Sequence, residues 1–155
     1  MENSTPVPRE NGRRFPSRLD SVAELLDWME ATRPAALSEE LWVQAKTAVV
    51  EGFTNAVRHA HAHLEPPPPV GVRIQIDSDA LELQVLDAGP PFQPRPATPQ
   101  PDQDRHWGLI MLQQLEKRYG WSIHYESVEA QGNVLRIRRP LAQEGPADPS
   151  GSAVP

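Results

Sequence analysis

Residues 51–60 read EGFTNAVRHA, and the prediction of the fold starts from this stretch. It lies inside a predicted helix over residues 39–62, with Ser38 as the N-cap and two acidic residues in the first turn, where they favour the positive end of the helix dipole. One broad face of this helix is apolar, made of Leu41, Ala45, Ala48, Val49, Gly52, Phe53, Ala56, Val57 and Ala60. A face of this width predicts a helix that covers a β-sheet.

Three polar residues of the same helix, Glu51, Asn55 and His59, follow one another at intervals of four and form a stripe along one side. At about 100° per residue the stripe borders the apolar face, so we expect it at the edge of the helix–sheet interface. A carboxylate and an amide there can meet a ligand beside the sheet. An ordinary solvated flank, with His59 partly packed, explains the same spacing.

The rest of the chain predicts a sheet made of two hairpins. Apolar and polar residues alternate over residues 70–76 and 81–85, on either side of a short Asp-Ser-Asp turn, and again over residues 121–125 and 135–137. Helical spacing marks two more helices, at residues 19–32 and 109–119. We therefore predict an α+β fold, a two-layer α/β sandwich with a mainly antiparallel sheet covered by helices on one face.

The 18 prolines divide the chain into parts. Residues 1–14 and 141–155 lack periodicity and are predicted to be disordered tails around a domain of residues 15–140. Six prolines lie in residues 90–101, which excludes a helix or a central strand and predicts an active-site lid, a binding loop or a disordered insert.

Composition excludes several classes of function. With 15 basic and 21 acidic residues the net charge is -6, and no basic patch suggests direct nucleic-acid binding. No apolar run reaches the roughly 20 residues of a membrane span, and no signal-peptide pattern opens the sequence. The absence of cysteine excludes disulfides, thiolate nucleophiles and cysteine zinc sites, and favours a cytoplasmic location.

Two places outside the predicted helix of residues 39–62 carry polar residues or glycines that suit ligand binding. Asp87 continues the inward series of its strand, where an apolar residue belongs, and a buried carboxylate needs a donor. Either a ligand supplies that donor, or the Asp-Ala-Gly sequence is an ordinary turn; Gly89 lets a ligand or backbone approach closely. Gly108 stands at the predicted start of the third helix, a natural phosphate site to which Arg105 and His106 can add donors.

In this order the elements resemble the Bergerat-fold ATPases of the GHKL superfamily, and most closely the bacterial anti-sigma-factor serine/threonine kinases. Residues 51–60 are similar to that family's N box, residues 86–92 (LDAGPPF) to its G1 box and residues 106–111 (HWGLIM) to its G2 box. The G1 box carries Pro91 in place of its second glycine, and the G2 box has a single glycine.

The resemblance implies ATP and Mg²⁺ as cofactors, and it assigns roles to individual residues. Glu51 is implied as the general base for the hydroxyl group of a protein serine or threonine, and Asn55 as the Mg²⁺ ligand. The implied nucleotide-binding residues are Asn55, His59, Asp87, Gly89, Arg105, Gly108 and Leu109. Within that set Asp87 accepts from the adenine amino group, Gly89 leaves room for the ring, and the backbone of Gly108 and Leu109 donates to phosphates.

The implied partners are a sigma factor and a STAS-type anti-sigma antagonist protein that receives the phosphoryl group; a homodimer stays open. The alternative is a catalytically degenerate module that acts by capturing partners only. A sensor histidine kinase is disfavoured because there is no room for a preceding dimerisation helix pair. A metal site at His59 and His63 is disfavoured because no third ligand accompanies them.

Overall fold

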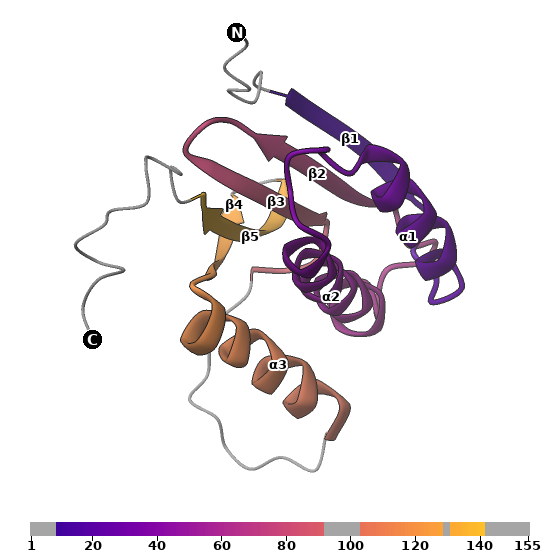
Figure 1. The fold of residues 1–155 in the computed structure, drawn as a ribbon. Helices are drawn as coiled ribbons and strands as arrows, with labels where there is room; N and C mark the ends of the chain where they lie inside the picture. The colour runs from indigo at the N-terminus through magenta and orange to yellow at the C-terminus, as the bar shows by residue number, and fades with distance from the viewer. Residues whose placement is uncertain (1–8, 92–102, 129–130, 142–155) are drawn as a thin grey trace, which may run out of the picture.

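The computed structural model describes residues 9–91, 103–128 and 131–141, and the side chains of residues 10–91, 111–128 and 131–141. Its core is one five-stranded antiparallel sheet in the order β1-β2-β3-β5-β4, with helices packed on one face (Figure 1). The strands are β1 (Arg9–Phe15), β2 (Val70–Ile76), β3 (Ala80–Asp87), β4 (Ser122–Val128) and β5 (Gly132–Pro140). The helices are α1 (Ser21–Thr32), α2 (Glu39–Asn55), a π-helical segment (Ala56–Ala60) and α3 (Gln103–Tyr119). The predicted two-layer α+β fold is confirmed.

Helix α2 forms the centre of the helical layer. Its start is fixed as predicted, because the Ser38 hydroxyl accepts a hydrogen bond from the Leu41 N–H at 3.1 Å. Its apolar face is buried on the sheet, and a Cβ at Gly52 would lie 2.6 Å from Leu135 Cδ2. Glycine at this position therefore lets the helix approach the strands β3 and β5 closely.

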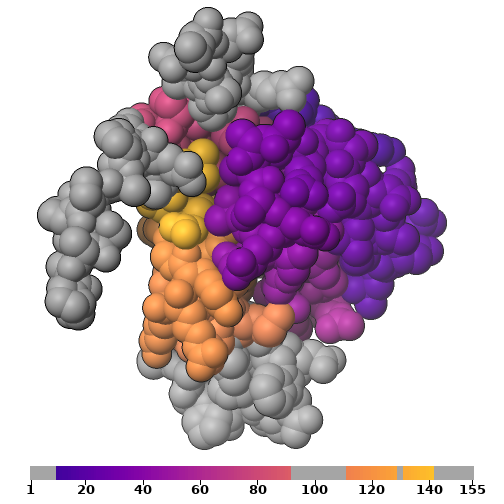
Figure 2. All heavy atoms as spheres, viewed as in Figure 1, coloured from indigo at the N-terminus to yellow at the C-terminus, as the bar shows by residue number. Residues whose placement is uncertain are grey.

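Helix α3 extends the same layer. Residues 111–128, in orange, lie directly against the purple surface of α2 (Figure 2). The Trp121 indole N–H, just after α3, donates to Gln44 Oε1 on α2 at 2.9 Å. The two predicted hairpins, β2–β3 and β4–β5, complete the sheet in the expected antiparallel pairing.

Strand β1 corrects the predicted N-terminal tail, because residues 9–14 lie in the sheet. Its backbone pairs with β2 from Arg9↔Ile76 to Phe15↔Val70. Among residues 10–15, the part of β1 whose side chains are described, only Phe15 is buried and apolar, so no alternating pattern marks the strand. Its pairing along β2 and the packing of Phe15 against Trp28, at 5.6 Å between ring centroids, hold it in place.

Helix α3 begins at Gln103, about two turns before the predicted start at residue 109. Most of the proline-rich stretch, residues 92–102, lies outside the described residues, and so do residues 142–155 of the predicted C-terminal tail. Within the described part of the chain, no helix has the length and apolar character to cross a membrane.

Candidate functional site

The π-helical segment that follows α2 meets the end of strand β3, so the two segments that carry the predicted site residues lie together. The Ala88 N–H donates to Nε2 of His61 at 2.8 Å. A Cβ at Gly89 would lie 2.6 Å from the carbonyl oxygen of Ala60. The helix of Glu51 and Asn55 therefore ends against the residues that follow Asp87.

A π-helical segment, Ala56–Ala60, interrupts the predicted helix between Asn55 and His61. The α-helix ends at Asn55, and the His61 N–H donates to the Ala56 carbonyl at 2.8 Å across five residues. Because a π turn holds more residues than an α turn, positions after Asn55 are rotated relative to the α-helical pattern. His59 is partly buried within this segment, and its place in the predicted stripe with Glu51 and Asn55 stays a prediction. Among the histidines whose side chains the structure describes, His61 is the buried one, at 3% exposed.

Asp87 lies on the inner face of the sheet, as predicted, and is only 5% exposed. Its Oδ1 accepts from the Gly89 N–H at 2.9 Å and from Nδ2 of Asn133 at 2.8 Å. Its Oδ2 accepts from the Tyr125 hydroxyl at 2.8 Å. The carboxylate is thus oriented by one local backbone donor and two side chains from the second hairpin.

Asn133 and Tyr125 are functional candidates that the sequence reasoning missed. Asn133 is 2% exposed, pairs directly across from Asp87, and also donates to the Pro90 carbonyl at 2.9 Å. Its Oδ1 accepts from the Ser127 hydroxyl at 2.9 Å. A signal was present, because Asn133 continues the inward series of β5 in the same way that Asp87 continues that of β3.

The donor set around Asp87 fits an adenine amino group. A carboxylate offers about four acceptor sites. Three protein donors among the described residues reach Asp87, two on Oδ1 and one on Oδ2. Among these described donors Oδ2 receives one, so this oxygen can also accept an N–H from a ligand, as an exocyclic amino group requires.

Gly89 permits a close backbone approach, one of the two roles expected for it. A Cβ there would lie 2.6 Å from the oxygen and 2.8 Å from the Cβ of Ala60. The missing side chain thus allows the chain after β3 to pack against the π-helical segment. Clearance for a ligand ring beside Gly89 stays a prediction.

A cavity of about 340 Å³ lies beside this segment. Its lining residues come from the end of β3 and from the β4–β5 hairpin: Ala88, Gly89, Pro91, Ser127, Val128, Gln131 and Gly132. The volume is in the range of small-molecule sites. Gly132 has a φ of +104°, and a Cβ there would lie 1.9 Å from the Asp87 carbonyl oxygen, so the hairpin closes tightly on the Asp87 strand.

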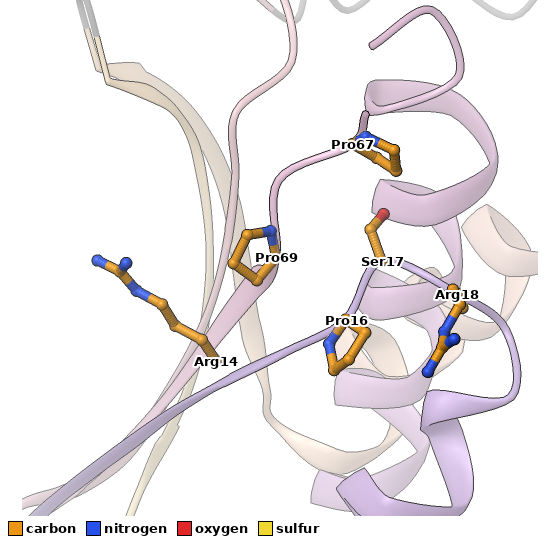
Figure 3. Close-up of a pocket in the computed structure, with 6 residues that line it drawn as sticks. All are labelled: Arg14, Pro16, Ser17, Arg18, Pro67 and Pro69. Atoms are coloured by element: carbon orange, nitrogen blue, oxygen red, sulfur yellow. The ribbon is translucent and has the colours of Figure 1, made fainter. Parts of the chain in front are cut away.

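A second, larger cavity of about 600 Å³ lies at the start of α1, lined by Arg14, Pro16, Ser17, Arg18, Pro67 and Pro69. Figure 3 shows the side chains of Arg14 and Arg18 extending in different directions, with their guanidinium groups well separated. They therefore do not converge on one anion. Ser17 is different from its neighbours, because it is buried and its Oγ lies 3.0 Å from Nδ1 of His61.

Glu51 and Asn55 form the other half of the predicted site. Both are partly buried on α2, one helical turn apart. Burial raises the pKa of the Glu51 carboxyl above its ordinary value, and the positive charge of Arg58 partly opposes that rise. A partly desolvated carboxylate is a stronger proton acceptor than an exposed one.

The oxygen atoms of this half suit Mg²⁺ held together with phosphates. No group of three or more His, Cys, Asp or Glu side chains that could hold a metal occurs among the described residues. Mg²⁺ commonly takes one or two protein oxygens and completes its shell with phosphate oxygens and water. The carbonyl oxygen of Asn55 can serve as such a ligand.

The predicted phosphate loop is placed differently from the expectation. Because α3 begins at Gln103, Gly108 and Leu109 lie inside the helix and beyond its first four N–H groups. Arg105 lies in the first turn, and the side chains of residues 103–110 are outside the described ones. The contribution of these three residues to phosphate binding stays a prediction.

Comparison with known proteins agrees with the fold. A family model described as the histidine kinase-like ATPase domain matches residues 15–139. No curated protein matches in sequence. A solved structure of the mycobacterial sensor histidine kinase MprB is similar with a TM-score of 0.46 and 19% sequence identity, over 84% of this chain and 97% of that chain.

The family model spans both hairpins, all three helices, and the Asp87 and Glu51–Asn55 positions. The sheet order and the helices on one face supply the matching architecture. The chain therefore belongs to the histidine kinase-like ATPase domain family and is an ATP-binding domain.

Proposed function

We propose that this ATP-binding domain is an ATP-dependent protein serine/threonine kinase of the anti-sigma-factor type. It phosphorylates a serine or threonine of a STAS-type antagonist protein and sequesters a sigma factor, in the cytoplasm. The observation that carries the proposal is the pair on α2, in which a partly buried carboxylate, Glu51, lies one turn before Asn55. The likeness of residues 51–60 and 86–92 to the anti-sigma kinase motifs supports the same reading.

The half of the site around Asp87, here called the adenine half, selects the nucleotide. Oδ2 of Asp87 accepts an N–H of the exocyclic amino group, and a buried acceptor discriminates strongly against a base that lacks a donor there. Asn133 and Tyr125 hold the carboxylate in one orientation through their hydrogen bonds to Oδ1 and Oδ2. Adenine nucleotides are therefore preferred over guanine nucleotides.

The half of the site formed by Glu51 and Asn55 carries out the proton transfer of the reaction. MgATP, when bound, supplies the phosphoryl group and the metal charge that balances it. The Glu51 carboxylate accepts the proton of the serine hydroxyl as the oxygen attacks phosphorus and ADP leaves. The raised pKa of Glu51 brings its basicity closer to the working pH, which favours this proton transfer.

One observation favours the second candidate, a degenerate module that captures partners without phosphorylating them. Gly108 and Leu109 lie inside α3, so their N–H groups are not among the free donors at a helix start. A site with few N–H donors for the phosphates binds the triphosphate weakly and transfers its phosphoryl group slowly.

The test separates binding from transfer. We expect Glu51→Gln to retain MgATP binding in isothermal titration and to lose transfer of ³²P to a STAS-type antagonist by at least about 100-fold, the usual contribution of a general base. Asn55→Ala should lose the Mg²⁺-dependent part of binding. The matched control is Glu40→Gln, an exposed position in the first turn of the same helix, and it should change neither.

Two results would reject the kinase proposal. One is equal transfer by Glu51→Gln and the unmodified chain. The other is an absence of transfer to every antagonist tried while a sigma factor is still sequestered, which would favour the degenerate module.

A further inference from the structure

His61 connects three segments that are distant in sequence. It follows the π-helical segment, its Nδ1 lies 3.0 Å from Oγ of Ser17 between β1 and α1, and its Nε2 lies 2.8 Å from the Ala88 nitrogen after β3. The ring is 3% exposed. His61 is not among the predicted site residues, and the kinase proposal gives it no role.

The contacts fix the tautomer of the imidazole. A backbone N–H can only donate, so Nε2 of His61 must be the unprotonated acceptor toward Ala88. The single proton of the neutral ring therefore lies on Nδ1 and is donated to the Ser17 hydroxyl oxygen. A second proton on the ring would face the Ala88 N–H and remove that hydrogen bond.

The bond to Ala88 acts directly on the adenine half of the site. Gly89, the next residue, donates its N–H to Asp87 Oδ1 and packs against Ala60. Asp87, Ala88 and Gly89 are thus held by His61 from the helix side and by Asn133 from the hairpin side. The bond from Asn133 to Asp87 does not depend on the protonation state of His61, whereas the bond from the Ala88 N–H to Nε2 requires the unprotonated nitrogen.

We propose that His61, oriented by Ser17, is a positioning residue for the nucleotide site, and that protonation of its ring releases the Ala88–Gly89 segment and weakens adenine-nucleotide binding. This inference rests on the proposed function in one respect, namely that the site around Asp87 binds an adenine nucleotide. The site thereby acquires a sensitivity to pH in the range where histidine titrates.

The groups that face the ring set the direction of its titration. Burial, the largest effect, lowers the pKa of His61 below its ordinary value of 6.5, while the Asp87 carboxylate and a Pro68 backbone hydrogen bond act to raise it. Ser17 is uncharged, and Arg18 beside it is exposed and ion-paired with Asp20. The neutral ring is therefore the form held at neutral pH.

The sign of the stability effect follows from that lowered pKa. The unfolded chain binds a proton at His61 more readily than the folded chain does, so stability rises with pH through this range. The contribution of the neutral ring is fully present above about pH 6.5, the unfolded pKa, and is lost as the pH falls through the folded pKa.

The test uses the full chain and three variants. His61→Gln places an amide oxygen where Nε2 accepts and cannot be protonated, His61→Leu removes the acceptor, and His63→Gln is the control at an exposed position two residues away. The readouts are the ¹⁵N signature of the His61 tautomer, hydrogen exchange of the Ala88 amide, and MgADP affinity by titration calorimetry between about pH 8 and pH 5.5.

We expect the Nδ1–H tautomer at pH 8, and faster Ala88 exchange by about 10-fold or more in His61→Leu. MgADP affinity should fall by about 10-fold in His61→Leu and by less than about 3-fold in His61→Gln at pH 8. Between pH 8 and pH 5.5 the unmodified chain and His63→Gln should lose about 5-fold more affinity than His61→Gln. The Glu51 titration is present in all of these proteins and cancels in that comparison.

The Nε2–H tautomer, unchanged Ala88 exchange in a folded His61→Leu, or one pH profile for His61→Gln and the unmodified chain would each overturn the inference. If His61→Leu does not fold, His61→Gln and the tautomer still decide it. If no protein binds MgADP at any pH, the proposed function fails, and the inference that His61 positions Ala88 is judged on the tautomer and the exchange alone.

Discussion

Two aspartates that flank strand β3, Asp77 before it and Asp87 at its end, accept the same kind of local hydrogen bond but have different roles. Asp77, just before β3, accepts from the N–H groups of Asp79 at 2.7 Å and Ala80 at 2.9 Å. Asp87, the last residue of β3, accepts from the N–H of Gly89 at 2.9 Å. Both are Asx-type turns, in which the side chain bonds the backbone two residues on.

The difference lies in what reaches them from elsewhere in the chain. Asp77 is exposed, and its carboxylate accepts hydrogen bonds from local backbone groups. Asp87 is buried and receives two side-chain donors from the second hairpin, Tyr125 and Asn133. An exposed aspartate of this kind shapes a turn, whereas a buried one held by distant donors is suited to bind a ligand.

The largest expected effect separates the two aspartates by nucleotide affinity. Asp87→Asn places an amide where the adenine amino group needs an acceptor, and it should weaken MgATP binding by about 1 to 3 kcal/mol, the scale of a hydrogen bond to a charged group. Asp77→Asn should leave the affinity unchanged. Titration calorimetry on both variants measures this, and equal affinity in a folded Asp87→Asn would remove the adenine assignment.

The next effect tests whether the hairpin donors support Asp87. Asn133→Ala removes donors to the Asp87 carboxylate and to the Pro90 carbonyl, and it should lower the free energy of unfolding by about 2 kcal/mol. Urea denaturation measures it, with the exposed Asn11→Ala of β1 as the control. Equal midpoints for the two variants would mean that the network around Asp87 contributes no stability.

A smaller effect is expected from the single hydroxyl on Oδ2. Tyr125→Phe keeps the ring and loses the bond to Asp87, so unfolding free energy without nucleotide should fall by about 1 kcal/mol. Tyr119→Phe, at an exposed residue of α3, is the control and should fall by less. A midpoint for Tyr125→Phe at or above that of the control would show that the hydroxyl does not stabilise the carboxylate.

The smallest effect belongs to Asp77. Its two backbone hydrogen bonds lower the pKa of its carboxyl below the ordinary 3.8, so the charged form contributes stability above that value and the contribution is lost as the pH falls through the folded pKa. Asp77→Asn should lower the Tm by about 1 °C at pH 7, because the site is exposed and screened. Calorimetric scans at pH 7 and below pH 3.8 should show that difference shrinking; a constant difference would contradict the assignment.

Much of the fold was predictable because its signals are local. Period-two alternation identified both hairpins, and the apolar face with Ser38 identified α2. Asp87 was found because it interrupts an apolar series. Strand β1 could not be found in this way, since its side chains other than Phe15 do not alternate and its place depends on the edge of β2.

The site was predictable in part for the same reason. Glu51, Asn55 and Asp87 were identified by position within single elements, and the structure keeps them on those elements. His59 was expected beside the site and is partly buried in the π-helical segment, whereas the buried His61, just after that segment, was not expected. A change from four-residue to five-residue hydrogen bonding leaves no sign in the spacing of apolar residues.

The sequence by itself determined the two hairpins, the helix α2 and the acid that ends the inner face of β3, since periodicity is a property of neighbours along the chain. Only the tertiary structure decided which groups satisfy that acid and which histidine is buried. The Ala88–His61, Ser17–His61 and Asn133–Asp87 bonds join residues 27, 44 and 46 positions apart. Such partners are chosen by strand register and by the packing of α2 on the sheet, because a buried polar atom bonds to whatever donor the fold brings within about 3 Å.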